Sequence, residues 1–341
     1  MQTSRELVKR ALEFNKPDRV PRQLWTLPWA DVYYPGETEK IRSVFPDDIV
    51  QITPAGLTAE GFSKRPGNEG EPYEKGTYLD VWGCRFTNMQ RGVIGETKEA
   101  LIKDDKYLDD GFETPEQVLK IDKAAINEFC AASDKFILAG DWARPFERLQ
   151  FLRGTEQLYI DLIERPQRML RTFDRVHDFY CRLITAWCNT EVDAVWYMDD
   201  WGSQRSLLID PKTWAEIFKP MYKDYIDIAH KHGKKIFMHS DGYTLDILPH
   251  LIEMGLDAIN TQIFCIGLEK LAQFKGSITF WGEIDRQYLI PHGSLQDIEA
   301  AVKLVHETLW QDGGCIAQCE FGAGANPRNV YKVFETWLQT T

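Results

Sequence analysis

Short runs of β-branched and aromatic residues alternate with helical patterns along most of this chain, and this alternation limits the possible folds more than any other feature. Such alternation is typical of a parallel sheet whose strands are joined by crossover helices. The predicted strands are residues 20–26, 48–52, 135–140, 193–198, 234–239, 257–262, 278–283 and 314–318. Eight strands with helices between them predict a (β/α)8 barrel, the TIM barrel of the α/β class. The length of 341 residues suits one such barrel.

Helix starts are marked between these strands. Asp210 and Asn326 each precede a proline, and Ser294 is followed by an acidic residue three positions on, so each can cap the first turn of a helix. No Gly-x-Gly-x-x-Gly or P-loop motif follows a predicted strand. This absence disfavours binding of dinucleotides and nucleoside triphosphates.

One segment, residues 53–110, interrupts the alternation. Within it, residues 78–87 and 93–101 have the pattern of the two arms of an antiparallel hairpin. We therefore predict a single domain over residues 1–341, with a hairpin inserted at about residues 75–102 that covers one end of the barrel.

Charge and cysteine content limit the classes of binding partner and the cellular location that the sequence predicts. The chain has 40 Lys and Arg against 52 Asp and Glu, a net charge of −12, which disfavours binding to nucleic acid. It contains no run of about 18 apolar residues that would predict a membrane span, and its charged first residues are unlike a signal peptide. Seven cysteines, an odd number without a disulfide pattern, predict a cytoplasmic protein whose thiols are free or bind metal.

Polar and aromatic side chains end or closely follow several predicted strands, and in a barrel these strand ends form the mouth that holds the active site. The candidates are Trp142, Asp200, Trp201, Gln204, His239, Asp241, Gln262, Glu283, Gln287, Cys319 and Glu320. Some of them have ordinary structural alternatives, since Asp at a strand end often caps a helix and a single His is commonly a core residue. His239 is favoured as a ligand because Asp241 lies two residues on and Cys319 ends another strand.

The residue types alone leave two chemistries open. His239, Asp241 and Cys319 form a mixed nitrogen, oxygen and sulfur set that suits Zn²⁺, which can activate a thiol or polarise a substrate oxygen. Asp200 and Glu283 instead form a carboxylate pair of the kind used in glycoside hydrolysis. Aromatic residues make up 12% of the chain, which suits a sugar, a large planar ligand or simple core packing.

Several motifs, taken together, resemble the uroporphyrinogen decarboxylase superfamily. Residues 199–204 read Asp-Asp-Trp-Gly-Ser-Gln, residues 239–242 read His-Ser-Asp-Gly, and residues 80–84 read Asp-Val-Trp-Gly-Cys. The opening segment, with Asp-Arg-Val-Pro at residues 18–21, is also similar. The resemblance runs nearly from end to end and implies a (β/α)8 barrel, in agreement with the strand pattern.

One branch of the superfamily decarboxylates tetrapyrroles, and the chain resembles it incompletely. Arg22 and Gln23 are similar to the start of that branch's Arg-Gln-Ala-Gly-Arg segment, but the second Arg is missing. Ala323 stands where the branch has a His. Tetrapyrrole decarboxylation, with Arg22 binding the substrate, is therefore the alternative function.

The other branch moves methyl groups between a corrinoid and a thiol or another methyl carrier, and holds Zn²⁺ with His-x-Cys and a later Cys. Resemblance to this branch implies that His239 and Cys319 are two of the ligands, with Asp241 in the position of the middle Cys. The chain lacks Asp-x-His-x-x-Gly, the segment with which carrier domains ligate cobalt. A corrinoid would therefore arrive on a separate carrier protein.

We therefore expect a metal-assisted methyltransferase that acts on a small methylated substrate, with zinc held by His239, Asp241 and Cys319. Glu283 or Glu320 would be a fourth ligand or a proton carrier. The residues expected to orient or bind substrate are Asp200, Gln204, Gln262, Gln287, Trp142 and Trp201. A glycoside hydrolase and a binding barrel without catalytic activity are the remaining alternatives.

Overall fold

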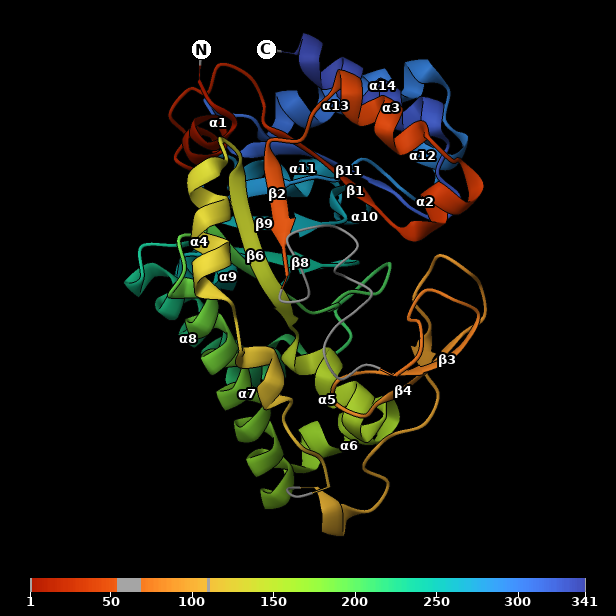
Figure 1. The fold of residues 1–341 in the computed structure, drawn as a ribbon, viewed down its shortest axis with the longest axis vertical. Coiled ribbons are helices and arrows are strands. Elements are labelled where there is room, and N and C mark those ends of the chain that lie inside the picture. The colour runs from red at the N-terminus through yellow and green to blue at the C-terminus, as the bar shows by residue number, and fades with distance from the viewer. Residues whose placement is uncertain (1, 54–68, 109–110, 341) are drawn as a thin grey trace.

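The computed structural model describes residues 2–53, 69–108 and 111–340, and within them eight parallel strands form one sheet (Figure 1). The order across the sheet is β1-β11-β10-β9-β8-β7-β6-β2. The strands are β1 (Arg22–Thr26), β2 (Ile49–Ile52), β6 (Phe136–Ala143), β7 (Ala194–Met198), β8 (Lys235–Ser240), β9 (Ala258–Thr261), β10 (Thr279–Trp281) and β11 (Cys315–Phe321). All eight predicted strands are confirmed, and the fold is the expected (β/α)8 barrel.

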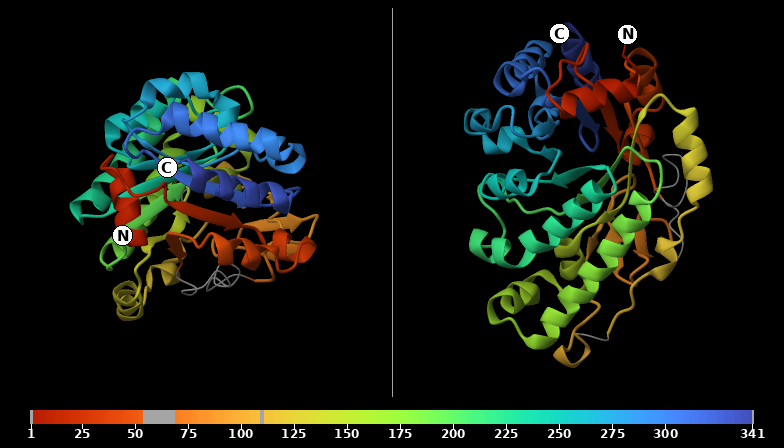
Figure 2. Two further views of the ribbon diagram at one scale, coloured as in Figure 1. Left: turned by 90° about the horizontal axis from the view of Figure 1, so that it is seen from above. Right: turned by 90° about the vertical axis from the view of Figure 1, so that its left-hand side faces the viewer.

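Helices surround the sheet and connect its strands (Figure 2). They are α1 (Ser4–Leu12), α2 (Pro28–Tyr33), α3 (Glu37–Val44), α4 (Lys123–Ala132), α5 (Pro145–Arg153), α6 (Thr155–Glu164), α7 (Gln167–Cys188), α8 (Pro211–Lys231), α9 (Leu248–Met254), α10 (Ile263–Ile266), α11 (Leu268–Leu271), α12 (Leu289–His292), α13 (Leu295–Leu309) and α14 (Pro327–Gln339). Three predicted helix starts are confirmed, because the side chains of Asp210, Ser294 and Asn326 accept hydrogen bonds from first-turn N–H groups. Among the described residues, no helix combines the length and apolar character needed to cross a membrane.

β1 and β2 are the first and last strands in the order across the sheet, and residues just before β2 form hydrogen bonds to β1. The N–H of Asp48 donates to the carbonyl oxygen of Arg22, and the N–H of Arg22 donates to the carboxylate of Asp48, both over 2.9 Å. Asp47 Oδ1 accepts a hydrogen bond from the N–H of Leu24 over 2.6 Å. Arg19 holds the Asp48 carboxylate with two nitrogens, at 2.6 and 2.7 Å. These bonds link the first two strands where the barrel closes.

Large aromatic side chains fill the inside of the barrel. The ring of Trp281 lies 4.9 Å from that of Trp25 and 5.2 Å from that of Phe237, measured between centroids. Its Nε1 donates to Gln23 Oε1 over 2.9 Å, and Trp196 lies 5.9 Å from Trp25. The barrel is therefore packed rather than hollow, and part of the aromatic content serves the core.

A three-stranded antiparallel sheet lies in the predicted insertion and is formed by β3 (Gly76–Leu79), β4 (Arg85–Asn88) and β5 (Glu96–Thr97). The predicted single hairpin was wrong in detail, because its first arm contains a turn of its own. Asp80 causes this turn, since its Oδ1 accepts hydrogen bonds from the N–H groups of Trp82 and Cys84 over 3.0 and 2.9 Å. Figure 1 shows this small sheet beside α5, toward which β6 points.

Candidate functional site

The carboxyl ends of β7 and β8 bring one imidazole and two carboxylates together at the mouth of the barrel. Nε2 of His239 lies 3.6 Å from Oδ1 of Asp200 and 3.6 Å from Oδ1 of Asp241. All three ligand atoms lie within 4.8 Å of one another. The separations are long for hydrogen bonds, but they approach the roughly 3.3 Å between nitrogen and oxygen ligands of a tetrahedral ion bound at about 2.0–2.1 Å. The arrangement can therefore hold a divalent cation.

Asn260, at the end of β9, sets the orientation of the His239 ring. Its Oδ1 lies 2.6 Å from His239 Nδ1. The Asn260 amide nitrogen donates to the backbone oxygen of Trp281 and, over 3.3 Å, to Oε1 of Gln318. Because the amide nitrogen is engaged in this way, Oδ1 must act as the acceptor and Nδ1 as the donor. The lone pair of His239 is then on Nε2, which faces the two carboxylates.

Asp241 offers a further sign that this group suits a metal. Its Oδ2 forms an ion pair with Nη2 of Arg286, whereas its Oδ1 is buried and has no hydrogen-bond partner among the described residues. A buried carboxylate oxygen without a partner is costly unless a ligand satisfies it. The N–H of Asp241 also donates to Asp200 Oδ1 over 3.0 Å, which fixes the second carboxylate. The donor set of one imidazole and two carboxylates therefore fits Zn²⁺ or a related divalent ion.

Cys319, the third metal ligand expected from the sequence, does not join this group of described residues. The expected strand ended before Cys319, whereas β11 continues through it to Phe321. Successive side chains of a strand point to opposite faces. Gln318 reaches into the barrel to Asn260, so Cys319 is directed to the other face, where it is buried in the larger core cluster. Burial, with the nearby carboxylates of Glu283 and Glu320, raises the pKa of its thiol.

Arg286 binds three carboxylates at the mouth. Besides its ion pair with Asp241, Nη1 lies 3.2 Å from Glu320 Oε2 and Nε lies 3.5 Å from Glu283 Oε1. Burial raises the pKa of Glu283 well above its usual range, against the opposing effect of Arg286. The structure therefore brings both predicted glutamates close to Asp241, with a guanidinium between them that offsets their repulsion.

The predicted glutamines have different surroundings. Gln262 is buried, and its Oε1 accepts a hydrogen bond from the N–H of Gly242 over 3.1 Å, so it supports the loop after His239. Gln204 and Gln287 are exposed. Of these three glutamines, Gln262 is thus the one whose side chain is hydrogen-bonded to the backbone beside the candidate site.

The side chains of Trp201 and Arg22 do not belong to the group at the mouth. Trp201 is fully buried, stacks on Phe146 at a centroid distance of 4.1 Å and donates through Nε1 to the hydroxyl of Tyr222 over 2.8 Å, so it is a core residue. Arg22 opens β1 and donates through Nε to the carbonyl oxygen of Pro46, which places it at the end of the barrel opposite the mouth. Trp142 belongs to β6, but its side chain lies outside the described part of the structure.

Glu147, which the sequence analysis missed, lies next to this group. Asp199 is buried and accepts hydrogen bonds from the N–H groups of Phe146 and Glu147, over 3.0 and 2.8 Å, so the end of β7 holds the first turn of α5. Burial raises the pKa of Glu147 to about 7; Asp200 also raises it, while Arg144 and His239 lower it. Its Oε2 is buried and finds no hydrogen-bond partner within the described ranges. Glu147 is therefore suited to proton transfer near neutral pH.

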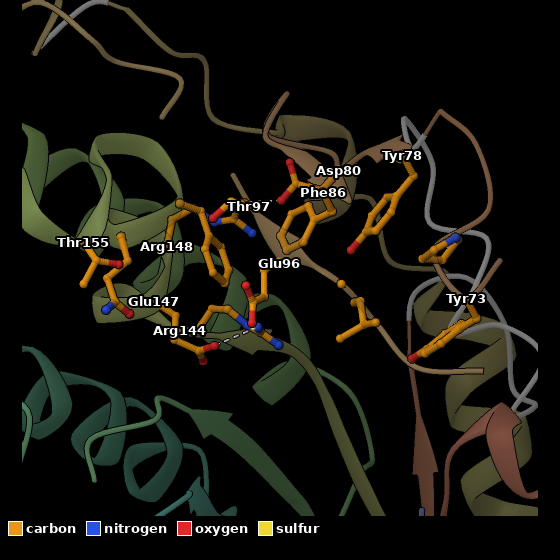
Figure 3. Close-up of a pocket in the computed structure, with 15 residues that line it drawn as sticks. Tyr73, Tyr78, Asp80, Phe86, Glu96, Thr97, Arg144, Glu147, Arg148 and Thr155 are labelled. Carbon is orange, nitrogen blue, oxygen red and sulfur yellow. Dashed lines mark hydrogen bonds and ion pairs between the residues drawn. The ribbon is translucent and has the colours of Figure 1, made fainter. Parts of the chain in front are cut away.

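A cavity of about 360 Å³ lies between α5 and the small antiparallel sheet (Figure 3). Glu147 and Arg144 line it together with the aromatic side chains of Tyr73, Tyr78, Phe86 and Phe151. Figure 3 shows Glu147 and Arg144 joined by an ion pair, in which the atoms are 3.3 Å apart. The cavity thus has aromatic walls, and one of its residues, Glu147, is electrostatically coupled to His239 and Asp200.

One sequence signal could have indicated Glu147. Pro145 follows the predicted strand 135–140 closely and is a favoured residue at the first turn of a helix. A helix starting there places Glu147 in its first turn, near the strand end and thus near the mouth. For Asn260, which lies near the end of a predicted strand, no local signal distinguishes a ligand-orienting amide from an ordinary core amide.

Comparison with known proteins identifies the family of the chain and solved structures of similar fold. The family model for uroporphyrinogen decarboxylase (URO-D) matches residues 103–337. A methyltransferase from Methanosarcina mazei has a similar structure, with a TM-score of 0.71 at 14% identity over 99% of each chain. A B12-independent methionine synthase from Shewanella sp. W3-18-1 is more distant, with a TM-score of 0.48 at 10% identity over 95% of this chain and 93% of the other. No curated protein matches the sequence significantly. The family match extends over more than half of the chain, and we conclude that the chain belongs to the uroporphyrinogen decarboxylase family.

Proposed function

We propose that this protein is a metal-assisted methyltransferase that moves a methyl group between a small methylated substrate and a corrinoid on a partner protein, or a thiol. The observation that carries the proposal is the group formed by Asp200, His239 and Asp241, in which a buried Asp241 oxygen lacks a partner among the described residues. The residues fit Zn²⁺, although the donor set has no thiolate. With fewer anionic sulfur donors the ion is a stronger Lewis acid, which suits an oxygen- or nitrogen-bearing substrate.

A zinc ion bound by these residues would supply Lewis acidity toward the heteroatom that carries the methyl group. Asn260 keeps Nε2 of His239 available, and Arg286 holds Asp241 in place through its other oxygen. These two contacts fix the ligands before any metal arrives, which reduces the cost of ordering them on binding.

Glu147 would supply the proton in this reaction. When the methyl group leaves for its acceptor, the bonding electrons stay on the substrate heteroatom, which then needs a proton. With its pKa near 7, Glu147 is partly protonated at neutral pH and can deliver a proton from Oε2. In the reverse direction, the same oxygen would accept the proton.

The cavity beside Glu147 would receive the methylated substrate. Its aromatic walls suit an apolar or planar body, while Arg144 and Glu147 provide a polar end. Tetrapyrrole decarboxylation has less support, because Arg22, on which that alternative depends, lies at the opposite end of the barrel. The glycosidase alternative is also weaker, since Glu283 is paired with Arg286 while Asp200 faces His239.

The proposal is tested with metal-free protein reloaded with Zn²⁺. Methyl transfer to free cobalamin, chemically reduced to the Co(I) state as a surrogate acceptor, is followed by absorbance with methylated amines, aryl methyl ethers and thioethers as donors. We expect activity that requires zinc and is lost in His239→Gln and Asp200→Asn, while His292→Gln, an exposed histidine elsewhere, retains it. Equal activity without metal would contradict the proposal, and conversion of uroporphyrinogen to coproporphyrinogen by metal-free protein would support the alternative.

A further inference from the structure

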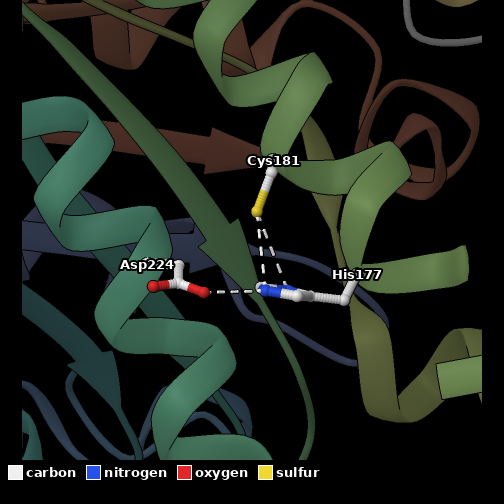
Figure 4. Close-up of side chains that lie close together, drawn as sticks. All are labelled: His177, Cys181 and Asp224. Carbon is white, nitrogen blue, oxygen red and sulfur yellow. Dashed lines mark hydrogen bonds and ion pairs between the residues drawn. The ribbon is translucent and has the colours of Figure 1, made fainter. Parts of the chain in front are cut away.

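A second group of side chains that could hold a metal ion lies between α7 and α8 (Figure 4). His177 and Cys181 are one helical turn apart on α7, and Asp224 faces them from α8. Nε2 of His177 lies 2.9 Å from Asp224 Oδ2 and 3.6 Å from Cys181 Sγ. Figure 4 shows the thiol and the carboxylate both directed at the imidazole.

The hydrogen bonds around His177 depend on which ring nitrogen carries the proton. The hydroxyl of Tyr225 lies 3.2 Å from Nδ1 of His177 and can accept a hydrogen bond from it. Nε2 then carries a lone pair that faces a carboxylate, which has no proton to offer. If Nε2 instead carries the proton, it donates to Asp224, and Nδ1 can then accept from the hydroxyl of Tyr225 or, over 3.8 Å, from the thiol of Cys181. A cation would satisfy the nitrogen, the oxygen and the sulfur together.

The spacing also agrees with a tetrahedral ion. Ligands at about 2.0–2.1 Å for nitrogen and 2.3 Å for sulfur are roughly 3.5 Å apart, and the observed nitrogen-to-sulfur distance is 3.6 Å. The nitrogen-to-oxygen distance of 2.9 Å would have to lengthen by about 0.4 Å. The Asp224 side chain is 60% exposed and can make that adjustment.

We propose that His177, Cys181 and Asp224 bind Zn²⁺, with water as the fourth ligand, and that the ion ties α7 to α8. Zinc suits a donor set of imidazole, thiolate and carboxylate. The site shares no residue with the group at the mouth, so the inference does not rest on the proposed methyl transfer. Its role is structural, because the ion would link two neighbouring helices on the outside of the barrel.

Cys181 would bind the zinc ion as a thiolate. Burial, together with the carboxylates of Asp224 and Asp178, raises the pKa of the Cys181 thiol to about 12. Zinc would displace its proton and convert the thiol into a ligand.

Co²⁺ titration of metal-free, full-length protein tests this site separately from the mouth. Thiolate bound to Co²⁺ gives a charge-transfer absorption, and the group at the mouth contains no cysteine. We expect this absorption in the wild type and in His239→Gln, its loss in Cys181→Ser, and at least about tenfold weaker Co²⁺ binding in His177→Gln and Asp224→Asn. Zn²⁺ should displace the Co²⁺, and it should raise the Tm of His239→Gln more than that of the double variant His239→Gln/Cys181→Ser.

Two matched controls accompany these variants. His230 forms an ion pair with Asp257 at the same 2.9 Å distance but without a thiol in the group, so His230→Gln should retain the cobalt absorption. Cys265 is a partly buried thiol elsewhere, so Cys265→Ser should also retain it. Absence of the absorption from wild type at saturating Co²⁺, or its persistence in Cys181→Ser, would overturn the proposal.

Discussion

The side-chain oxygen of Asn260 lies 2.6 Å from Nδ1 of His239, and this contact turns the other ring nitrogen toward Asp200 and Asp241. A histidine that binds metal commonly donates its second N–H to such an acceptor, which fixes both the tautomer and the ring orientation.

Replacing Asn260 should therefore weaken metal binding without removing a ligand. For Asn260→Ala, we expect Zn²⁺ affinity at the mouth to fall by about 10- to 100-fold. Isothermal titration of metal-free protein measures the change in a Cys181→Ser background, which removes a ligand of the second proposed zinc site. Asn329→Ala is the matched control, because its buried amide binds backbone oxygens near α12 and lies outside the metal group. Equal loss of affinity in both variants would show that Asn260 acts only through general stability.

Glu147 should make the stability of the protein depend on pH. Its pKa is about 7 in the folded chain against 4.5 in the unfolded chain, so the folded state binds more protons between these values. The contribution of Glu147 to the free energy of unfolding is therefore largest below about pH 4.5, and it falls as the pH rises toward 7. Relative to Glu147→Gln, the wild type should lose up to about 1.4 kcal/mol of unfolding free energy per pH unit in this window.

Urea denaturation at several pH values measures this difference for Glu147. Glu128→Gln, a change at an exposed position on α4, serves as control and should give a difference from wild type that varies little with pH. A pH-independent difference between wild type and Glu147→Gln would be inconsistent with the raised pKa.

Cys319 should be dispensable for metal binding at the mouth. In Cys319→Ala we expect zinc content and affinity at Asp200, His239 and Asp241 to match the wild type, because the thiol is directed to the other face of β11. The loss of a buried sulfur atom should lower the unfolding free energy by about 1 kcal/mol. Metal analysis makes the comparison with Asp200→Asn, which should lose the equivalent of zinc that is bound at the mouth. Equal zinc loss in both variants would restore Cys319 as a ligand.

Arg286 should become less important once a cation occupies the site. Arg286→Gln leaves Asp241, Glu283 and Glu320 close together without their guanidinium, so metal-free protein should lose about 3 kcal/mol of unfolding free energy. Zinc bound beside Asp241 would offset part of this repulsion, so the loss should be smaller with saturating Zn²⁺. Thermal denaturation with and without zinc measures both values. An identical loss in the two conditions would argue against a cation next to Asp241.

The strand pattern and the helix caps were predictable because each depends on residues close together in the chain. The eight strands were found from local alternation, and the caps at Asp210, Ser294 and Asn326 from the two or three residues that follow them. The same local signals placed His239 and Asp241 together at one strand end, and two residues on the same face of a strand remain neighbours in any sheet.

The remaining features of the site needed the tertiary structure. Whether Cys319 faces the barrel or the helices depends on where β11 ends and how it pairs, and these are set by its neighbours β1 and β10. Glu147 reaches the mouth because Asp199, more than fifty residues away, holds the start of α5. Arg286 was not predicted because its role is to separate carboxylates from three different strand ends. The sequence alone thus determined the barrel and the His239–Asp241 pair, whereas long-range packing decided which charged groups surround that pair.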